Sequence, residues 1–557
     1  FQSSIDYKII IGLGHQATAD SVQINWPDRT TMTLLHPAIN QVHYIAKGAA
    51  NQKMTDAAPA ASDVFFEPVS SSFDKHQEDN VIDFYIERNI PRVLSREGPK
   101  AAAGDVNGDG LQDIFIGGTP GHPGQLYLQQ PDGTFRKKDE KSIDRFREFE
   151  DVAVRLFDCD GDGDLDLLLC PGGNNARPFS RELQLRLFKN DGQGNFLVDA
   201  AAFPSTGMNI AVAIDYDFTG DGYPDLFIGG RSYPQLYGAN PDSYLFVNDG
   251  HGHFTDIAKT KNKDIATIGM VCSAAWADVA GDSHKELIIT GEWMHPRIFS
   301  YTGDHFTEIK TGLENLSGWW QSVTTVDLNG DGKQDLVLGN MGENFYLHPD
   351  NNDPVKLWIN DYDRNGSTEK VLTYTVDGKD MPVVLKKDME DQLPSIKKDN
   401  LRNEEYAKKP IQELFPHDLI GKAEIKRINY TSSCVAINNG DGHFTIRKLP
   451  PMAQLSCINT VFCDDLNGDG YPDLVLGGNQ FGFMPQFERL DASFGDILIN
   501  DGKGNFTWLD DTRTGLNIRG EVRDIISVMT KKGRQLLVLQ NNDFPLLYKA
   551  GRLNKMK

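Results

Sequence analysis

The sequence predicts an all-β fold: a seven-bladed β-propeller with metal loops, an α-containing insertion in blade five and a small partial β module at the N-terminus. An acidic nine-residue phrase recurs along the chain, β-forming stretches flank each copy, and the copies are spaced like single blades. The 557 residues carry 56 Lys and Arg against 79 Asp and Glu, a formal charge of −23. Such a chain repels phosphate backbones, which argues against nucleic acid as a partner. Its apolar runs are far shorter than the roughly 20 residues of a membrane helix.

The repeated phrase begins and ends with Asp and has Gly at its fourth and sixth positions. Five copies match this pattern, at residues 105–113, 158–166, 217–225, 327–335 and 465–473. A decayed copy runs from Asp278 to Glu286, with Ala280 at its third position and Ser283 at its sixth. The spacing between copies is suitable for one four-stranded sheet each.

Each copy is predicted to join the first and second strands of a sheet. A third strand and an Asn-Asp-Gly turn follow, as in residues 244–254, because that tripeptide favours the positive φ of a hairpin. Six phenylalanines open a fourth strand, at positions 135, 196, 254, 306, 444 and 506. A seventh blade has three strands near 522–527, 535–540 and 545–548. We expect residues 65–69 to supply its fourth strand and close the ring, which protects the sheet edges.

The domain boundaries follow from these elements. We expect a partial β module over residues 1–46, a linker over 47–63 and the propeller over 64–557. In blade five, strand two ends at Gly339 and strand three resumes at residues 433–437, so an insertion of about residues 345–432 lies between them. Its helical stretch at 403–409 is broken up by prolines, and long structured insertions are usually functional.

The loops present oxygen ligands at positions 1, 3, 5 and 9, which suits Ca²⁺ better than Mg²⁺. Leu or Ile at position 12 excludes an EF-hand. We expect about five calcium ions, a further site at 361–369 and an empty decayed loop; the alternative is that the loops are only Asx turns. The predicted ligands are Asp105, Asn107, Asp109, Asp113, Asp158, Asp160, Asp162, Asp166, Asp217, Thr219, Asp221, Asp225, Asp327, Asn329, Asp331, Asp335, Asp361, Asp363, Asn365, Glu369, Asp465, Asn467, Asp469 and Asp473.

The opposite face of the predicted disc carries the connections between strands two and three. Amides, an arginine and aromatic rings at these positions are predicted to surround a concavity and bind a glycan or a peptide. The alternative is that the amides cap strands and the tryptophans pack in the channel. The candidates are Asn174, Asn175, Arg231, Trp293, Trp319, Trp320, Asn340 and Asn479.

The loops, the Gly-Gly strand ends and the Asn-Asp-Gly hairpins resemble FG-GAP (VCBS-type) repeats of the integrin-α-like propeller. Residues 12–46 are similar to the end of an ASPIC/UnbV module. Gly318-Trp319-Trp320 and the 339–344 stretch further resemble large surface proteins of Bacteroidota-type bacteria, of which this chain would be the C-terminal half. The resemblance implies an extracellular or cell-surface protein associated with the outer membrane.

The resemblance also implies a calcium-stabilised binding or assembly module for a glycan, peptide or protein, as an accessory or subunit of an outer-membrane complex or a nutrient-uptake system. No nucleophile elbow, zinc-protease or phosphate-loop motif is present, so we do not expect an enzyme. The alternative function is a calcium-dependent polysaccharide-degrading enzyme, a lyase or a hydrolase. The six cysteines form no metal or redox motif and are expected to be buried.

Overall fold

The computed structural model describes residues 9–14, 16–26, 30–47, 52–53, 64–440 and 442–550. The chain divides into two compact units, residues 1–62 and 63–557. In the first unit, β1 (Ser21–Asn25), β2 (Thr30–Leu35) and β3 (Gln52–Lys53) form an antiparallel sheet. Strand β3 lies in the predicted linker, most of which is outside the described residues.

The second unit is all-β and propeller-like, which confirms the predicted class. Within the described residues it holds seven four-stranded antiparallel sheets besides the insertion. In order they are β5 (Ala101–Gly104), β6 (Asp113–Ile116), β7 (Gln125–Gln129) and β8 (Phe135–Lys138); β9 (Asp151–Phe157), β10 (Asp166–Pro171), β11 (Arg186–Asn190) and β12 (Phe196–Asp199); β13 (Asn209–Tyr216), β14 (Asp225–Ser232), β15 (Tyr244–Asn248) and β16 (Phe254–Asp256); β17 (Met270–Ala277), β18 (Glu286–Met294), β19 (Arg297–Thr302) and β20 (His305–Ile309); β22 (Ser322–Val326), β23 (Asp335–Gly339), β28 (Cys434–Asn438) and β29 (Phe444–Lys448); β30 (Ile458–Asp464), β31 (Asp473–Gly478), β32 (Asp496–Asn500) and β33 (Phe506–Trp508); and β34 (Val522–Thr530), β35 (Gly533–Gln540), β36 (Leu546–Ala550) and β4 (Phe66–Val69). A short strand, β21 (Gly318–Trp319), extends the fourth sheet by pairing with β18.

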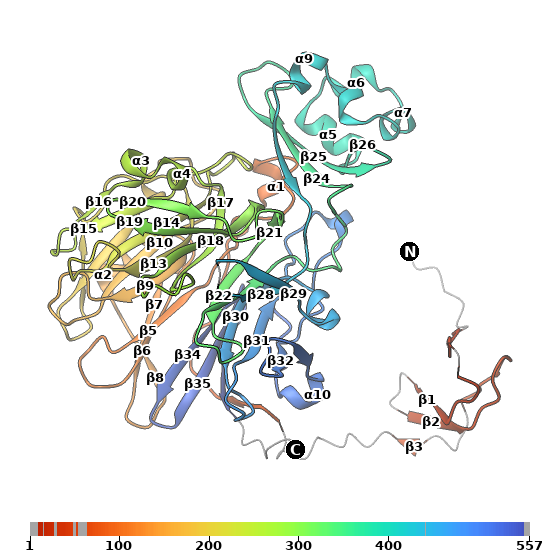
Figure 1. Ribbon diagram of the computed structural model, residues 1–557, viewed down its shortest axis with the longest axis horizontal. Helices are drawn as coiled ribbons and strands as arrows, with labels where there is room; N and C mark the ends of the chain where they lie inside the picture. Colours follow the sequence, from red (N-terminus) through yellow and green to blue (C-terminus); the bar gives the residue numbers. More distant parts are fainter. Residues whose placement is uncertain are drawn as a thin grey trace. The chain divides into compact units, whose positions relative to one another are not determined.

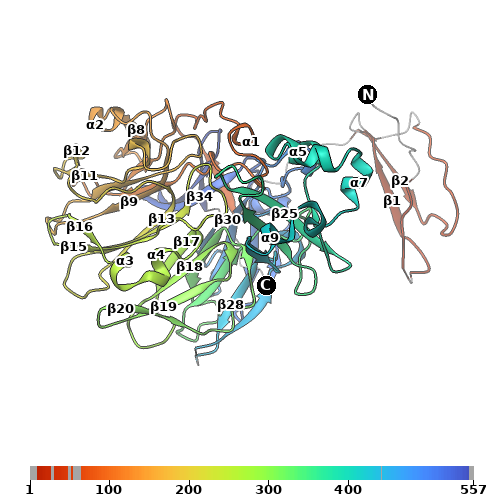
Figure 2. The same ribbon diagram turned by 90° about the horizontal axis from the view of Figure 1, so that it is seen from above.

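The first strands of these sheets meet in a closed cycle. Strand β5 contacts β9, and the contacts continue through β13, β17, β22, β30 and β34 back to β5. Figures 1 and 2 show the sheets following one another in chain order, from orange through green to blue. Apolar side chains fill the space between neighbouring sheets; between the second and third, for example, Leu168, Ile210 and Phe246 pack together. Each sheet is thus buried on both faces.

The seventh sheet joins the two ends of this unit, as the sequence predicts. Its fourth strand is β4, which pairs antiparallel with β36 and places Val69 opposite Leu547. Phe65 and Phe66 are buried there with Ile497 and Tyr548. Among the described residues, the first and last strands of the unit are therefore paired with each other.

A β-bulge recurs near the start of the first strand. In five sheets one residue of that strand has no opposite partner and is left between two paired neighbours. The bulged residues are Val152, Ala211, Cys272, Asn459 and Arg523. All five line one small cavity, together with Lys100 and Gln321 just before β5 and β22. The bulges therefore direct one side chain per sheet toward a common centre.

The insertion leaves the fifth sheet after β23 and returns at β28. It is a sheet of order β26-β25-β24-β27 with five short helices. Its elements are β24 (Val355–Asn360), β25 (Glu369–Val376), β26 (Lys379–Pro382), α5 (Lys386–Gln392), α6 (Ile396–Asp399), α7 (Asn403–Ala407), α8 (Ile411–Leu414), α9 (His417–Ile420) and β27 (Glu424–Ile428).

The insertion sheet is buried on both faces. On one face Trp358 packs with the helices, through Met389 and Tyr406 among others. On the other face Leu357 and Leu372 join a cluster of side chains from the seven-sheet unit. The insertion therefore covers part of that unit.

Residues 73–100 lie between β4 and β5, and most of residues 89–100 are buried. The 73–100 segment contains α1 (Asp83–Ile86), and the buried Asp83 carboxylate accepts hydrogen bonds from the Leu94 and Ser95 N–H groups at 2.8 and 3.0 Å. The other described helical turns connect strands: α2 (Lys141–Asp144), η1 (Arg181–Leu183), α3 (Ala258–Lys261), α4 (Lys263–Ala266), η2 (Pro451–Gln454), η3 (Pro485–Phe487) and α10 (Asp511–Thr514). Within the described part of the chain, none of the helices is long and apolar enough to cross a membrane.

The junction strand gives a stability prediction. Phe66 is 2% exposed, so Phe66→Ala removes a ring from the packed seventh sheet and should lower the free energy of unfolding by about 3–5 kcal/mol. Leu197→Ala is the control, because this side chain of β12 is 72% exposed and its truncation should change stability little. Denaturant unfolding measures both; equal effects would show that β4 does not hold the seventh sheet.

Candidate functional site

The acidic loops lie where the sequence places them, between the first and second strands of their sheets. In the first loop the Asp105 carboxylate accepts hydrogen bonds from three backbone N–H groups: Gly108 at 2.8 Å, Asp109 at 3.2 Å and Gly110 at 2.7 Å. Both glycines have positive φ, which a side chain would strain. The first Asp therefore folds the turn around its own carboxylate.

The decayed loop makes the same turn. Asp278 accepts from Gly281 at 2.6 Å, from Asp282 at 3.2 Å and from Ser283 at 2.8 Å. Ser283 adopts the positive φ of 74° that glycine has in the other copies. Ala280 has no side-chain oxygen, yet the turn forms, so the geometry of the turn does not depend on an oxygen ligand at this position.

The ninth residue of each loop is a buried carboxyl group. In the sixth sheet Asp473 accepts from Leu466 N–H at 3.0 Å and from Asn500 N–H at 2.8 Å. Burial raises the pKa of Asp473 to about 6, against the lowering effect of these two hydrogen bonds. Burial likewise raises the pKa of Asp113 and Asp225 to about 6, and raises the pKa of Asp166 and Asp335. A bound cation would favour the charged form of these groups.

Four of the loops, the decayed one included, are also tied to the next sheet by a hairpin asparagine. The Asn500 side chain donates to Leu328 O of the preceding loop at 2.7 Å, and Asn190, Asn248 and Asn438 make the equivalent bond at 2.8 Å. The second loop residue supplies the carbonyl in every case. The shape of one loop is therefore coupled to the position of the neighbouring sheet.

Three groups of side chains bring possible metal ligands within 4.8 Å of one another in the described residues. They are Asp158, Asp160 and Asp162; Asp361, Asp363 and Glu369; and Cys159, Asp160 and Asp166. The first two groups offer only carboxylate oxygens, the donors that suit Ca²⁺.

The second-sheet loop and the insertion loop differ in how far nearby cations balance the charge of their carboxylates. Lys189 Nζ lies 2.6 Å from an Asp160 oxygen, so this loop already has partial charge compensation. In the insertion loop, the nearby Arg364 pairs instead with Asp418, at 3.0 Å. Of the two carboxylate groups, the one in the insertion loop therefore has less of its negative charge balanced by a nearby cation.

The predicted ligand-binding amides are mostly buried and hydrogen bonded. Asn174 is 0% exposed; it donates to Glu87 at 3.1 Å and accepts from Gln235 N–H at 2.8 Å. Asn340 and Asn479 are equally buried and bond to neighbouring backbone groups. Asn175 is on the surface and donates to Asp79 at 3.0 Å. The side chains of Asn174, Asn340 and Asn479 therefore hold connections between strands together.

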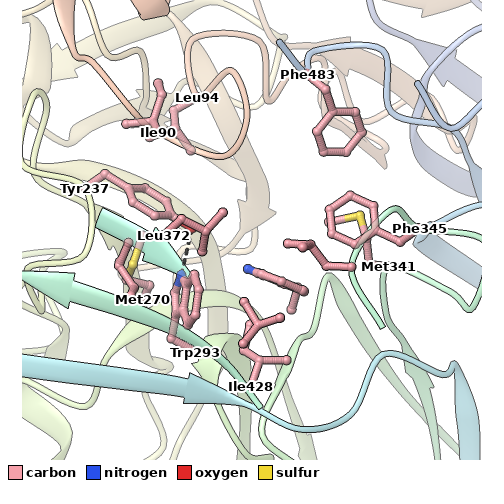
Figure 3. Close-up of a cluster of buried hydrophobic side chains, with 14 of the residues drawn as sticks. Ile90, Leu94, Tyr237, Met270, Trp293, Met341, Phe345, Leu372, Ile428 and Phe483 are labelled. Atoms are coloured by element: carbon pink, nitrogen blue, oxygen red, sulfur yellow. Dashed lines mark hydrogen bonds between the residues drawn. The ribbon is translucent and has the colours of Figure 1, made fainter. Parts of the chain in front are cut away.

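The predicted tryptophans also pack within the protein. Trp293 and Trp319 belong to a cluster with Tyr237, Phe345 and residues of the insertion, and Trp293 Nε1 donates to Tyr237 Oη at 2.7 Å (Figure 3). Trp320 is fully buried and donates to Leu316 O at 2.9 Å. The sequence analysis expects these rings around a concavity; in the structure the insertion and the 73–100 segment cover Trp293 and Trp319, and Trp320 packs between the fourth and fifth sheets.

Arg231 is buried at the centre, where sequence reasoning did not find its partners. Its guanidinium lies 3.4 Å from Glu97, and Glu97 pairs with the buried Arg92. Arg92 in turn donates to Glu292 at 2.5 Å. Arg92 and Glu97 precede the first repeat and match no repeat position, so only their charge in an otherwise buried stretch could have marked them.

Comparison with protein-family models shows that the chain contains FG-GAP-like repeats. They match residues 105–169, 158–228, 217–289 and 278–338, and a further FG-GAP repeat matches 319–359. An ASPIC and UnbV model matches residues 1–52. No curated protein matches the chain.

Three similar solved structures share 12–15% identity with the chain. A lectin from Agrocybe aegerita that recognises non-reducing terminal N-acetylglucosamine covers 86% of this chain and 96% of its own, with a TM-score of 0.43 and 15% identity. The V. cholerae biofilm matrix protein Bap1 covers 88% and 92%, with a TM-score of 0.36 and 12% identity. A Bacillus licheniformis rhamnogalacturonan lyase covers 87% and 91%, with a TM-score of 0.26 and 12% identity. At these scores the likeness does not identify a function.

The raised pKa of the ninth-position carboxyls gives a pH prediction for protein freed of divalent cations. A carboxyl group whose pKa is higher in the folded than in the unfolded protein stabilises the fold fully when the pH is below its unfolded-state pKa. This stabilisation is lost as the pH rises through its folded-state pKa. With Asp113, Asp225 and Asp473 near 6, the melting temperature should fall as pH rises from about 5 to 7. Melts after passage over a chelating resin test this; a melting temperature that rises over the same interval contradicts it.

Proposed function

We propose that the ring of sheets is a seven-bladed β-propeller stabilised by calcium at its acidic loops. The closed cycle of first strands supports the blade number, and the oxygen-only ligand sets support the metal. The sites are those at residues 105–113, 158–166, 217–225, 327–335 and 465–473, with one more at 361–369. The ion would hold the carboxylates of one loop together, and the loop would hold the next sheet.

We further propose that the protein is a non-catalytic binding or assembly module at the bacterial cell surface. Its partner would be a protein or a glycan, within or beside an outer-membrane complex or a nutrient-uptake system. Weak calcium sites fill outside the cell, where calcium is millimolar, which supports an extracellular location. The FG-GAP-like repeats support a binding role over an enzymatic one.

One observation carries the choice of binding face. Ile82, Tyr85 and Ile86 are 45%, 72% and 42% exposed; Tyr85 and Ile86 belong to α1, and Ile82 directly precedes it. The adjoining Glu87 accepts from Tyr237 N–H at 2.7 Å, just after the second strand of its sheet, so α1 lies on the side opposite the acidic loops. An exposed apolar group beside a large insertion is typical of a recognition surface.

Calcium binding is tested by counting bound ions. Asp331 and Asp282 both occupy the fifth loop position and accept a backbone N–H two residues later, at 3.0 and 2.9 Å. Asp331→Asn should remove about one ion from an intact loop and lower the melting temperature by several degrees, since ions bound only by the folded form stabilise it. Asp282→Asn is the matched control in the decayed loop and should change neither quantity. Equilibrium dialysis with metal analysis decides; an unchanged count for both variants contradicts the proposal.

Partner binding is tested by variants of the exposed helix. Tyr85→Ala should weaken capture of a glycan or a membrane protein at least tenfold, because it removes a large exposed ring, while Leu197→Ala on the outer strand β12 should not. Glycan arrays and native pull-downs from solubilised membranes identify the partner. New reducing or unsaturated ends on an incubated polysaccharide would instead favour the enzyme.

A further inference from the structure

An exposed apolar patch lies on the face opposite the acidic loops, at the second and third sheets. It consists of Tyr85 and Ile86 of α1 together with Phe179 and Leu236, and these side chains are 72%, 42%, 63% and 41% exposed. Phe179 lies in the connection from the second to the third strand of its sheet, and Leu236 lies in the equivalent connection of the next sheet. The exposed patch therefore extends beyond α1.

Hydrogen bonds to one buried amide bring α1 and these connections together. Asn174, in the same connection as the exposed ring of the second sheet, accepts from Gln235 N–H at 2.8 Å, next to Leu236. The Asn174 side chain also donates to Glu87 at 3.1 Å, and Glu87 directly follows Ile86. The exposed patch thus surrounds a single set of bonded residues.

The Phe179 ring is held in solvent by an unfavourable backbone conformation. Its φ is 63°, in the left-handed region that a phenylalanine rarely adopts. Phe179 N–H donates to Gly207 O at 3.0 Å, and a Cβ at Gly207 would lie 2.3 Å from Phe179 Cδ1, so glycine is needed there. The ring centroid lies 5.8 Å from that of Tyr233. Burial does not explain a ring that is still mostly exposed, and strained residues of this kind cluster at recognition sites.

Arginines without a carboxylate partner flank the exposed patch, in a chain of formal charge −23. Arg88 lies two residues after α1, and Arg177 lies in the connection after β10. Both are exposed, and within the described residues neither forms an ion pair. Asp79 is the carboxylate bonded to the same connection, and Arg181 and Glu182 are adjacent and offset each other. Two arginines against one carboxylate leave the charge beside the exposed patch positive.

Resting on the binding role proposed above, we infer that the exposed patch docks an acidic peptide segment of a partner protein. Apolar side chains of the segment would pack on Phe179 and Tyr85, and its carboxylates would pair with Arg177 and Arg88. Aromatic residues and arginine are enriched in such protein contacts. A glycan is disfavoured, because its hydroxyl groups would meet aliphatic side chains that cannot hydrogen bond, and the Asn174 amide is fully buried.

The test begins by panning a displayed library of random short peptides over the calcium-loaded full chain. Wild-type and Phe179→Ala proteins are panned in parallel, and the peptides that only the wild type retains are sequenced. We expect Asp and Glu to be enriched next to Leu, Phe or Tyr. The net charge of −23 disfavours nonspecific retention of such peptides. An empty selection, or selected peptides without acidic enrichment, would overturn the inference.

The most enriched peptide, labelled with a fluorophore, then reports affinity by anisotropy. Phe179→Ala and Arg177→Glu should each weaken binding about tenfold or more. Affinity should also fall as ionic strength rises from about 0.05 M to about 0.5 M, because exposed ion pairs are screened. The matched controls are Leu197→Ala and Arg136→Glu, which change exposed side chains of the outer strands β12 and β8 and should leave affinity unchanged. Equal effects of patch and control variants would contradict the assignment.

Two outcomes separate this inference from the proposed function. Retention of polygalacturonate, with no peptide retained, would assign the exposed patch to a glycan and overturn the peptide inference while leaving the binding role intact. A partner captured in the pull-down through Tyr85, with no acidic peptide bound, would likewise overturn only the chemistry inferred for the partner. The proposed function itself fails if Tyr85→Ala changes no capture.

Discussion

The carboxylate of the first loop residue is the constraint on which the architecture depends. It accepts three N–H groups of its own turn, so the chain reverses at the same place in each sheet that carries the loop. The reversal sets which residues of the first and second strands are opposite each other. It also places the ninth carboxyl group where a third-strand asparagine can bond to it. That asparagine in turn holds the loop of the preceding sheet.

This chain of contacts explains why the sequence predicts the fold so well. Each residue involved appears at a fixed position in the repeat, and its contacts are local or lie one sheet away. The strands that open at Phe135 and Phe196 begin where predicted, and residues 66–69 complete the last sheet. The sequence predicts the hairpin asparagines only as turn formers, whereas in the structure they also join sheets, a role that depends on the closed packing.

The opposite face was harder to predict because its contacts are not periodic. The sequence predicts a binding role for Asn174 and Trp293 from their chemistry, but their surroundings come from residues 73–100 and from the insertion, which follow no repeat. The residues next to an amide in the sequence do not reveal whether its side chain is buried or exposed. Arg92 shows the same difficulty: its partner Glu292 lies two hundred residues away, and only the fold brings the two together.

The pairing of β4 with β36 also has a kinetic consequence. Val69 can pair only once Leu547 has been synthesised, so the seventh sheet becomes complete only after nearly the whole of the unit has been made. Until then, one β-strand near the start and three near the end have exposed edges that can pair with another chain. Closure of the junction during folding, more than the stability of the closed ring, is therefore the point at which this architecture is most vulnerable.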